Sequence, residues 1–268
     1  MRLYRKLQQN PFFILGPCVI ESEQLLVEVA EKIKELERRF EATFVFKASF
    51  DKANRTSIHA FRGVGIEKGL ALLTKIKATY NLPILTDVHE AHQVERAALV
   101  ADIIQIPAFL SRQTDLLLAA GASTKIVNVK KAQFLAPKDM IYVVNKIKST
   151  GNEQILLTER GTTFGYNNLV VDFLGMVEMM DLGYPVVMDA THSVQKPGAG
   201  RGKSLGNGQY APYLANAAAA IGIQGYFMEV HPNPTKALSD GPNMIPLEKI
   251  GEVLENIQKI IRLDLTRK

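Results

Sequence analysis

The sequence predicts an α/β protein, a (β/α)8 TIM barrel that forms a single catalytic domain over residues 1–268. Eight short apolar runs rich in Val, Ile and Phe alternate with amphipathic segments, which is the pattern of repeated β-α units around a parallel sheet. The length of 268 residues is typical of such a barrel. Because no linker or low-complexity tract divides the chain, one domain is expected.

The predicted strands and helices follow from the local hydrophobic period. Strands are expected at 12–15, 43–47, 83–86, 102–106, 126–129, 154–158, 185–188 and 225–229. Apolar residues at helical spacing predict helices over 23–40, 63–80, 140–149 and 247–263. The small residues of 215–221 predict a further helix that packs closely on the barrel.

Each predicted strand ends in polar or ionisable residues. In a (β/α) barrel the active site lies at the carboxyl ends of the strands, so these side chains are expected to converge. In strand order they are Cys18 and Glu21; Lys47 and Lys52; Asp87 and His89; Gln105, Phe109 and Arg112; Lys130 and Lys131; Glu159 and Arg160; Asp189 and His192; Glu229 and His231.

The stretch TFVFKASFDKANRT, residues 43–56, begins as a buried strand and then becomes strongly polar. Its lysines offer point charges, and Arg55 offers a fork that can hold a phosphoryl group or a carboxylate. A solvated loop is the alternative for this stretch taken alone. The further cations at other strand ends favour an anionic substrate with more than one acidic group.

Composition excludes several classes of protein. The net charge of +5 is spread along the chain without a long basic run, so a nucleic-acid partner is not expected. No apolar run approaches the length of a membrane span. The N-terminal 20 residues are basic and then apolar, but Gly16-Pro17 interrupts the apolar run and no export signal is expected. A single cysteine, Cys18, excludes an internal disulfide and fits a cytoplasmic location.

Cys18, His192, Glu229 and Asp240 are a thiol, an imidazole and two carboxylates, a set that is able to hold a divalent transition metal. They lie far apart in sequence, and only the barrel brings the first three together. A small buried residue is the alternative for Cys18, and a loop-orienting or acid-base histidine is the alternative for His192. A nucleophilic Cys-His pair is a further alternative.

The segment PGAGRGKS, residues 197–204, is similar to a phosphate-binding P-loop. Pro197 stands where that motif requires glycine, and the segment lies well past the end of its strand. We expect instead a mobile glycine-rich lid over the barrel mouth, within 196–210, from which Lys203 reaches the substrate.

Five segments closely resemble 3-deoxy-D-manno-octulosonate 8-phosphate synthases. They are FKASFDKANR from Phe46, IIQIPAFLSRQTDLL from Ile103, NVKKAQFLAP from Asn128, TERGTTFGYNNLVVD from Thr158 and DATHSVQ from Asp189. The likeness covers essentially the whole chain. It implies a transferase on a (β/α) barrel that condenses phosphoenolpyruvate with D-arabinose 5-phosphate and releases inorganic phosphate, a step in the synthesis of the Kdo sugar of lipopolysaccharide.

The resemblance also implies roles for individual residues. Those expected to bind phosphoenolpyruvate are Lys47, Ser49, Lys52, Gln105, Lys130 and Arg160. Asn54, Arg55 and Thr56 would hold arabinose 5-phosphate, with Phe109 beside the substrates and Arg112 supplied by a neighbouring subunit of a homotetramer. The expected catalytic residues are Lys47, Lys52, Lys130, His192 and Asp240.

The resembled family has metal-dependent and metal-independent branches, the latter with asparagine where this chain has Cys18. Cys18, His192, Glu229 and Asp240 match the metal-dependent branch, which implies a divalent ion of the Mn, Fe, Zn, Co or Cd type. Two features depart from that pattern: the segment after Gln195 differs from the expected loop, and Asp240 is followed by Gly-Pro as in the metal-independent branch.

Three rival functions remain open at this stage. A sister synthase would use erythrose 4-phosphate on the same barrel. A P-loop nucleotide hydrolase would bind nucleotide at 198–204. A catalytically inactive barrel that senses a phosphorylated ligand would bind without releasing phosphate; the complete set of ionisable residues at the strand ends disfavours it.

Overall fold

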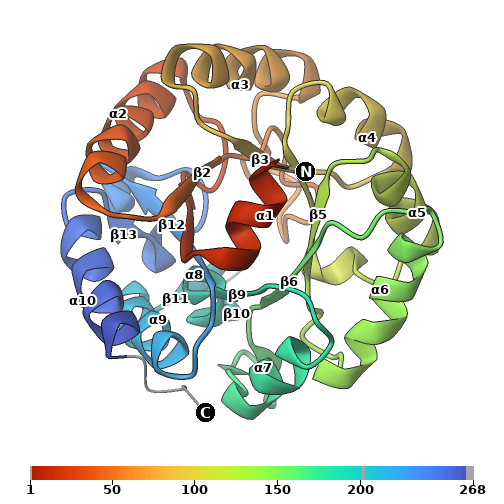
Figure 1. The fold of residues 1–268 in the computed structure, drawn as a ribbon. Helices are drawn as coiled ribbons and strands as arrows, with labels where there is room; N and C mark the ends of the chain where they lie inside the picture. Colours follow the sequence, from red (N-terminus) through yellow and green to blue (C-terminus); the bar gives the residue numbers. More distant parts are fainter. Residues whose placement is uncertain (1, 201–202, 264–268) are drawn as a thin grey trace.

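The chain forms a closed parallel barrel of eight strands, described in a computed structural model for residues 2–200 and 203–263. The strand order is β1-β2-β3-β4-β5-β6-β9-β12, and β1 pairs with β12 to close the barrel (Figure 1). The strands are β1 (Phe12–Gly16), β2 (Thr43–Lys47), β3 (Ile84–Asp87), β4 (Ile103–Ile106), β5 (Ile126–Lys130), β6 (Ile155–Glu159), β9 (Val186–Asp189) and β12 (Gly225–His231). All eight predicted strands are confirmed to within two residues at each end.

Helices surround the barrel as an outer layer (Figure 1). They are α2 (Glu23–Arg39), α3 (Ile66–Tyr80), α4 (Ala91–Ala98), α5 (Thr114–Ala122), α6 (Met140–Lys148), α7 (Phe173–Met180), α9 (Ala211–Ala220) and α10 (Ile250–Arg262). The short helix α8 (Ala190–Ser193) follows β9, and all four of its residues are buried. The prediction for α9 began four residues late, because Pro212 is tolerated in the first turn, where its missing N-H is not needed. Among the described helices, none is both long and apolar enough to cross a membrane.

Alternation along each strand creates two apolar layers. Residues that face outward, such as Phe44, Val127 and Leu157, pack under the helices in the larger core. Residues that face inward form a second, smaller core inside the barrel. Its strand members are Phe12, Ile14, Val45, Leu85, Ile103, Ile126, Leu156, Val187 and Phe227.

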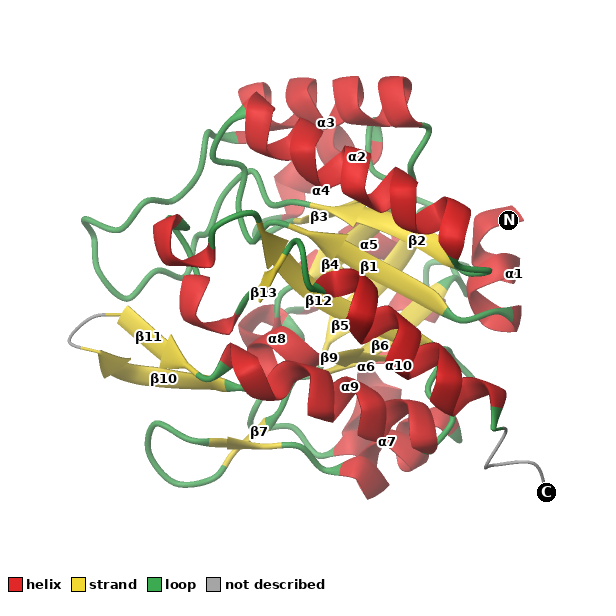
Figure 2. Cartoon of the chain, turned by 90° about the vertical axis from the view of Figure 1, so that its left-hand side faces the viewer, coloured by secondary structure: helices red, strands yellow, loops and turns green. Residues whose placement is uncertain are grey.

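A short N-terminal helix that the sequence analysis did not predict closes one end of the barrel. This helix, α1 (Arg2–Gln9), lies across the amino ends of the strands (Figures 1 and 2). Tyr4 and Leu7 are buried in the inner core, and the Tyr4 hydroxyl donates to the carbonyl of Ile155 at 3.0 Å. The basic and apolar character of this segment therefore reflects a plug with one buried face.

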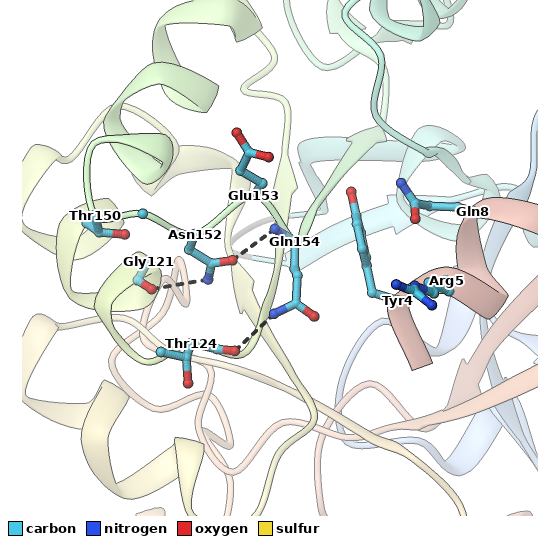
Figure 3. A pocket seen from close by; sticks show the side chains of 10 residues that line it. Tyr4, Arg5, Gln8, Gly121, Thr124, Thr150, Asn152, Glu153 and Gln154 are labelled. Atoms are coloured by element: carbon cyan, nitrogen blue, oxygen red, sulfur yellow. Dashed lines mark hydrogen bonds between the residues drawn. The ribbon is translucent and has the colours of Figure 1, made fainter. Parts of the chain in front are cut away.

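A polar hollow of about 420 Å³ lies between α1 and the loops that lead into β5 and β6 (Figure 3). Asn152 lines this hollow and donates to the carbonyl oxygens of Gly121 and Lys125 at 3.1 and 2.8 Å. Gln154 donates to the carbonyl of Thr124 at 3.2 Å. The hydrogen bonds of Asn152 and Gln154 therefore stabilise the loops. The hollow lies at the end of the barrel opposite the polar strand ends.

Much of the segment expected to form a glycine-rich lid belongs to two paired strands, and its mobility stays a prediction. Strands β10 (Gln195–Gly200) and β11 (Lys203–Gly206) pair antiparallel and project beyond the carboxyl ends of the barrel strands (Figure 2). Residues 201 and 202 and the side chain of Lys203 lie outside what the structure describes, so the expected substrate contact of Lys203 stays a prediction. A P-loop needs a helix after its lysine, whereas here a strand follows; the P-loop alternative is therefore wrong.

Smaller elements complete the loops at this end. Strands β7 (Thr162–Thr163) and β8 (Leu169–Val170) form a second short hairpin after β6. Strand β13 (Ile245–Pro246) pairs in parallel with the last two residues of β12, Val230 and His231. It follows the turn that contains Asp240. Asp240 adopts a left-handed conformation with φ of 50°, which directs the chain sharply toward β13.

We predict that Leu7→Ala lowers the free energy of unfolding by about 2–5 kcal/mol, because it leaves a cavity under the plug in the inner core. Urea denaturation followed by circular dichroism measures the change. Lys6→Ala, an exposed change on the same helix, is the matched control and should have little effect. Equal stability of the two variants would contradict a sealing role for α1.

Candidate active site

The polar side chains at the barrel mouth continue the inward-facing rows of the inner core. Each barrel strand except β1 places an apolar residue inside the barrel first and a polar one two or four positions later, since every second residue faces inward. Lys47 thus follows Val45, and Glu229 follows Phe227. The other inward polar residues of this kind are Asp87, Gln105, Asn128, Lys130, Thr158, Arg160 and Asp189, all buried.

Lys52 and Asp87 form one ion pair at the mouth, with Lys52 Nζ 3.1 Å from Asp87 Oδ2. Lys52 Nζ also donates to Ser49 Oγ at 2.9 Å, and Ser49 and Gln105 each donate to the Asp87 carboxylate. Burial acts to raise the pKa of Asp87, but Lys52 and Lys47 outweigh it and hold the pKa well below its usual range. The carboxylate thus keeps Lys52 charged and fixes three predicted substrate-binding side chains.

Lys130 forms a second cluster with Asp189, His192 and Phe227. Its Nζ lies 2.7 Å from Asp189 Oδ2, 3.3 Å from His192 Nδ1 and 3.9 Å from the centre of the Phe227 ring. Burial lowers the pKa of Lys130, although Asp189 acts in the opposite direction. The ammonium group is therefore held by a carboxylate and an aromatic face in a buried site.

Lys47 and Glu229 form a third ion pair, with Nζ 2.5 Å from Oε1 and both side chains almost fully buried. Lys47 Nζ also donates to the carbonyl of Cys18 at 2.8 Å. Burial acts to raise the pKa of Glu229, but Lys47 and His192 outweigh it and leave the pKa below its usual value. Glu229 is therefore ionised, and its Oε2 has no hydrogen-bond partner within the described part of the chain.

Cys18, Glu229 and Asp240 converge so that one donor atom of each lies within 4.8 Å of the others. The Cys18 thiol is 3.3 Å from Asp240 Oδ2 and 2.9 Å from the Ser239 hydroxyl. Burial raises the pKa of Cys18, with Glu229 adding to the effect. Without a metal to stabilise the thiolate, Cys18 is a neutral thiol, which disfavours the Cys-His nucleophile.

His192 lies beside this group and fits the same donor set. Its Nε2 is 3.6 Å from Glu229 Oε1 and 3.9 Å from Asp240 Oδ2, and its Nδ1 is 2.7 Å from Asp189 Oδ2. With the proton on Nδ1, the lone pair of Nε2 faces the two carboxylates. A carboxylate that orients a histidine in this way is typical of metal sites, and the unpartnered Glu229 Oε2 offers a further ligand atom. The four residues therefore fit a divalent ion.

Arg160 joins the mouth to the turn of Asp240 through Gln195. Arg160 donates to Gln195 Oε1 at 2.7 Å, and Gln195 Nε2 donates to Asp240 Oδ1 at 2.8 Å. The other terminal nitrogen of Arg160 is buried and has no partner among the described residues. It is therefore available to an anionic ligand.

Asn54, Arg55 and Thr56 lie in the loop between β2 and α3, away from the buried cluster. Asn54 and Thr56 are exposed, whereas Arg55 is half-buried and donates from Nε to the carbonyl of Phe61 at 3.1 Å. One terminal nitrogen of Arg55 is buried without a partner in the described chain. This loop offers an outer set of donors above the mouth.

Phe109 and Arg112, which follow β4, are exposed, and among the described residues neither side chain has a hydrogen bond or an ion pair with the buried cluster. The backbone carbonyl of Arg112 accepts a hydrogen bond from Lys146 at 3.0 Å. The structure thus brings together the predicted residues of the inner site and leaves these two on the surface. For Arg112, which is expected to act at a neighbouring subunit, the contact with substrate stays a prediction.

Three residues that sequence reasoning did not assign to the site carry much of its geometry. Asp87 and Asp189 were noted only as strand ends, and Gln195 was not considered. The signal for the two aspartates was present, since each lies two positions after an inward-facing apolar residue, Leu85 or Val187. Gln195 had no such signal, because it lies beyond α8 and reaches Arg160 only through the tertiary fold.

Comparison with known proteins places the chain among related sequences. A family model described as "DAHP synthetase I family" matches residues 7–263. A protein from Desulfatibacillum aliphaticivorans named 2-dehydro-3-deoxyphosphooctonate aldolase is 58% identical over 92% of this chain and 90% of its own length. Proteins with the same name from Synechococcus sp. and Fusobacterium nucleatum are 57% and 54% identical, over 91% and 93% of this chain and 86% and 91% of their own lengths.

We predict that Asp87→Asn costs about 3–5 kcal/mol of unfolding free energy at neutral pH, because it leaves Lys52 charged and unpaired inside the mouth. The folded-state pKa of Asp87 is depressed, so its contribution to stability is present above the unfolded pKa of about 3.9 and is lost as pH falls toward the folded pKa. The difference between wild type and variant should therefore shrink below about pH 4.

Denaturation at a series of pH values measures this difference. Asp139→Asn, which removes an exposed carboxylate, is the control and should give a small effect that hardly varies with pH. A pH-independent cost of Asp87→Asn would show that shape and hydrogen bonding, rather than the charge, make Asp87 important.

Proposed function

Since the chain belongs to the DAHP synthetase I family, we propose that it is a 3-deoxy-8-phosphooctulonate synthase. It condenses phosphoenolpyruvate, D-arabinose 5-phosphate and water to 3-deoxy-D-manno-octulosonate 8-phosphate and inorganic phosphate, in Kdo and lipopolysaccharide biosynthesis. The shared name of relatives that are 53–58% identical supports this activity. The structural observation that carries it is the set of cations at the mouth: Lys47, Lys130 and Arg160, which are buried, and Lys52, whose side chain is 12% exposed.

The four cations suit phosphoenolpyruvate, which carries a phosphate and a carboxylate. We assign Arg160 and Lys130 to these anionic groups, since Arg160 has a buried nitrogen without a partner among the described residues and Lys130 is buried at the same mouth. Ser49, Lys52 and Gln105 complete the binding surface. The outer donors of Asn54, Arg55 and Thr56 are placed to hold the phosphate end of arabinose 5-phosphate.

The reaction joins two polyanions, so much of its barrier is positioning and charge neutralisation. C3 of phosphoenolpyruvate forms a bond to the aldehyde carbon of the sugar, and the aldehyde oxygen takes up a proton. Water adds at C2, and the resulting hemiketal phosphate releases inorganic phosphate by cleavage of its C-O bond. Lys47, Lys52 and Lys130 neutralise the charge that develops, while Asp189 holds the His192 ring in place.

A divalent ion held by Cys18, His192, Glu229 and Asp240 would supply Lewis-acid chemistry, by acidifying a water or polarising the aldehyde. We assign acid-base roles to His192 and Asp240; His192 Nε2 and Asp240 Oδ2 lie 3.9 Å apart, a separation that one intervening water could bridge. The fit of the donor set supports an ion of the Mn, Fe, Zn, Co or Cd type.

We further propose that the protein acts in the cytoplasm as a homotetramer, in which Arg112 reaches the active site of a neighbouring subunit and Phe109 lies beside the substrates. The exposure of Arg112 on the loop after β4 supports this arrangement. The whole chain then acts as one catalytic domain, closed by loops from its neighbour.

We predict phosphate release when the protein is given phosphoenolpyruvate and arabinose 5-phosphate together. If the metal proposal holds, release disappears after a strong chelator and returns with an added divalent ion, and elemental analysis finds the ion in the untreated protein. Release that survives chelation would retain the synthase and refute the metal requirement. Activity only with erythrose 4-phosphate would favour the sister synthase, and binding without release would favour a sensor.

Replacing Lys130 by alanine should reduce kcat about 10²- to 10³-fold at saturating substrates, because a buried cation that stabilises developing charge is lost. Steady-state phosphate release measures the change. Lys138→Ala, which removes an exposed lysine paired with Glu178, is the matched control. Near-normal turnover of the Lys130 variant would remove Lys130 from the catalytic machinery.

A further inference from the structure

Directly beside two proposed substrate-binding cations lie two charged residues that face the other way. Lys131 follows Lys130 at the end of β5, and Glu159 precedes Arg160 at the end of β6. Ile126 and Leu156 face into the barrel whereas Val127 and Leu157 face the helices. The same alternation directs Lys130 and Arg160 into the mouth, and Lys131 and Glu159 outward behind it.

Lys131 and Glu159 meet as a fully buried pair. Lys131 Nζ lies 3.4 Å from Glu159 Oε2, and neither side chain has any exposed surface. The ammonium group also donates to the carbonyl of Leu135 at 3.2 Å and to the hydroxyl of Thr162 at 3.0 Å. One lysine thus joins the loop after β5 to the loop after β6.

Glu159 fixes the turn that immediately follows Arg160. Its Oε1 accepts a hydrogen bond from the backbone N-H of Gly161 at 2.5 Å. Gly161 has φ of 90°, a left-handed conformation that glycine adopts readily and other residues do not. The direction in which the chain leaves Arg160 therefore depends on the carboxylate of Glu159.

A contribution to the stability of the fold does not by itself explain why Lys131 and Glu159 form a buried ion pair. Replacing a buried ion pair by uncharged residues of similar size often leaves stability unchanged or improves it. A pair that joins two loops through four contacts does, however, define the distance between the strand ends that carry Lys130 and Arg160. Backbone bonds from Lys131 N to Thr158 O at 2.8 Å and from Thr163 N to Gln133 O at 2.9 Å continue the same connection.

We propose that Lys131 and Glu159 are positioning residues that set the placement of Lys130 relative to Arg160, and through it the affinity of the site for phosphoenolpyruvate. This proposal rests on the proposed function. Neither residue touches the substrate. They act from behind the mouth, where their charges and hydrogen bonds hold the two cations at the separation that one phosphorylated carboxylic acid requires.

The test compares Lys131→Met, Glu159→Gln and the double variant. Each single change leaves one buried charge without its partner and should lower the melting temperature, whereas the double variant removes both charges and should recover much of the loss. In all three we expect the KM for phosphoenolpyruvate to rise at least about tenfold, with kcat and the KM for arabinose 5-phosphate changed less than about threefold.

The double variant separates positioning from stability. A double variant with wild-type melting temperature and wild-type KM for phosphoenolpyruvate would overturn the proposal, as would a parallel rise in the KM of both substrates. The matched control is Lys148→Met with Glu153→Gln. It removes an exposed ion pair, with 3.3 Å between Lys148 Nζ and Glu153 Oε1, that joins the end of α6 to the segment before β6. It should leave every kinetic constant unchanged.

Thermal protection by phosphoenolpyruvate gives a readout that needs no turnover. The wild-type melting temperature should rise with phosphoenolpyruvate, and reaching the same rise in the double variant should require at least about tenfold more ligand. Wild type that binds phosphoenolpyruvate without releasing phosphate would refute the proposed function while this comparison still decides the positioning role. Equal protection of wild type and double variant would refute the positioning role alone.

Discussion

Charge compensation inside the largely buried barrel mouth is the constraint on which the rest of this structure depends. Three lysines with little or no exposed surface each have a carboxylate partner from another strand: Lys47 with Glu229, Lys52 with Asp87 and Lys130 with Asp189. Burial disfavours a charged lysine, and a neighbouring carboxylate acts in the opposite direction; beside Asp87 the pKa of Lys52 lies well above its usual value. The protein therefore presents positive charge whose side chains are fixed in place before an anionic substrate arrives.

The same pairing leaves specific donors and acceptors free. One nitrogen of Arg160 and one oxygen of Glu229 have no partner among the described residues, although both are buried. The first suits an anion and the second suits a cation. Gln195 connects the two regions, because it accepts a hydrogen bond from Arg160 and donates one to Asp240.

A period of two along each strand organises the molecule from one end to the other. Inward positions carry, in order, the apolar residues that receive the α1 plug and the polar residues of the mouth. Outward positions carry the apolar residues that receive the helices and, at the end of β5 and β6, the Lys131–Glu159 pair. At the carboxyl ends of β5 and β6, residues that face the mouth thus alternate with residues that pack behind it. A substitution of a residue that packs behind the mouth can therefore shift its neighbours within the mouth.

The sequence by itself determined the eight strands, most of their helices and the polar strand ends, because hydrophobic period and β-branched runs are local properties. It also indicated the inner site, since Lys47, Lys130 and Glu229 lie at fixed distances from apolar positions. Only the tertiary structure decided that α1 seals the barrel, that residues 195–200 and 203–206 pair as antiparallel strands, and that Gln195 joins Arg160 to Asp240. These features depend on which segments become neighbours when the barrel closes, and closure is a long-range property that no local pattern encodes.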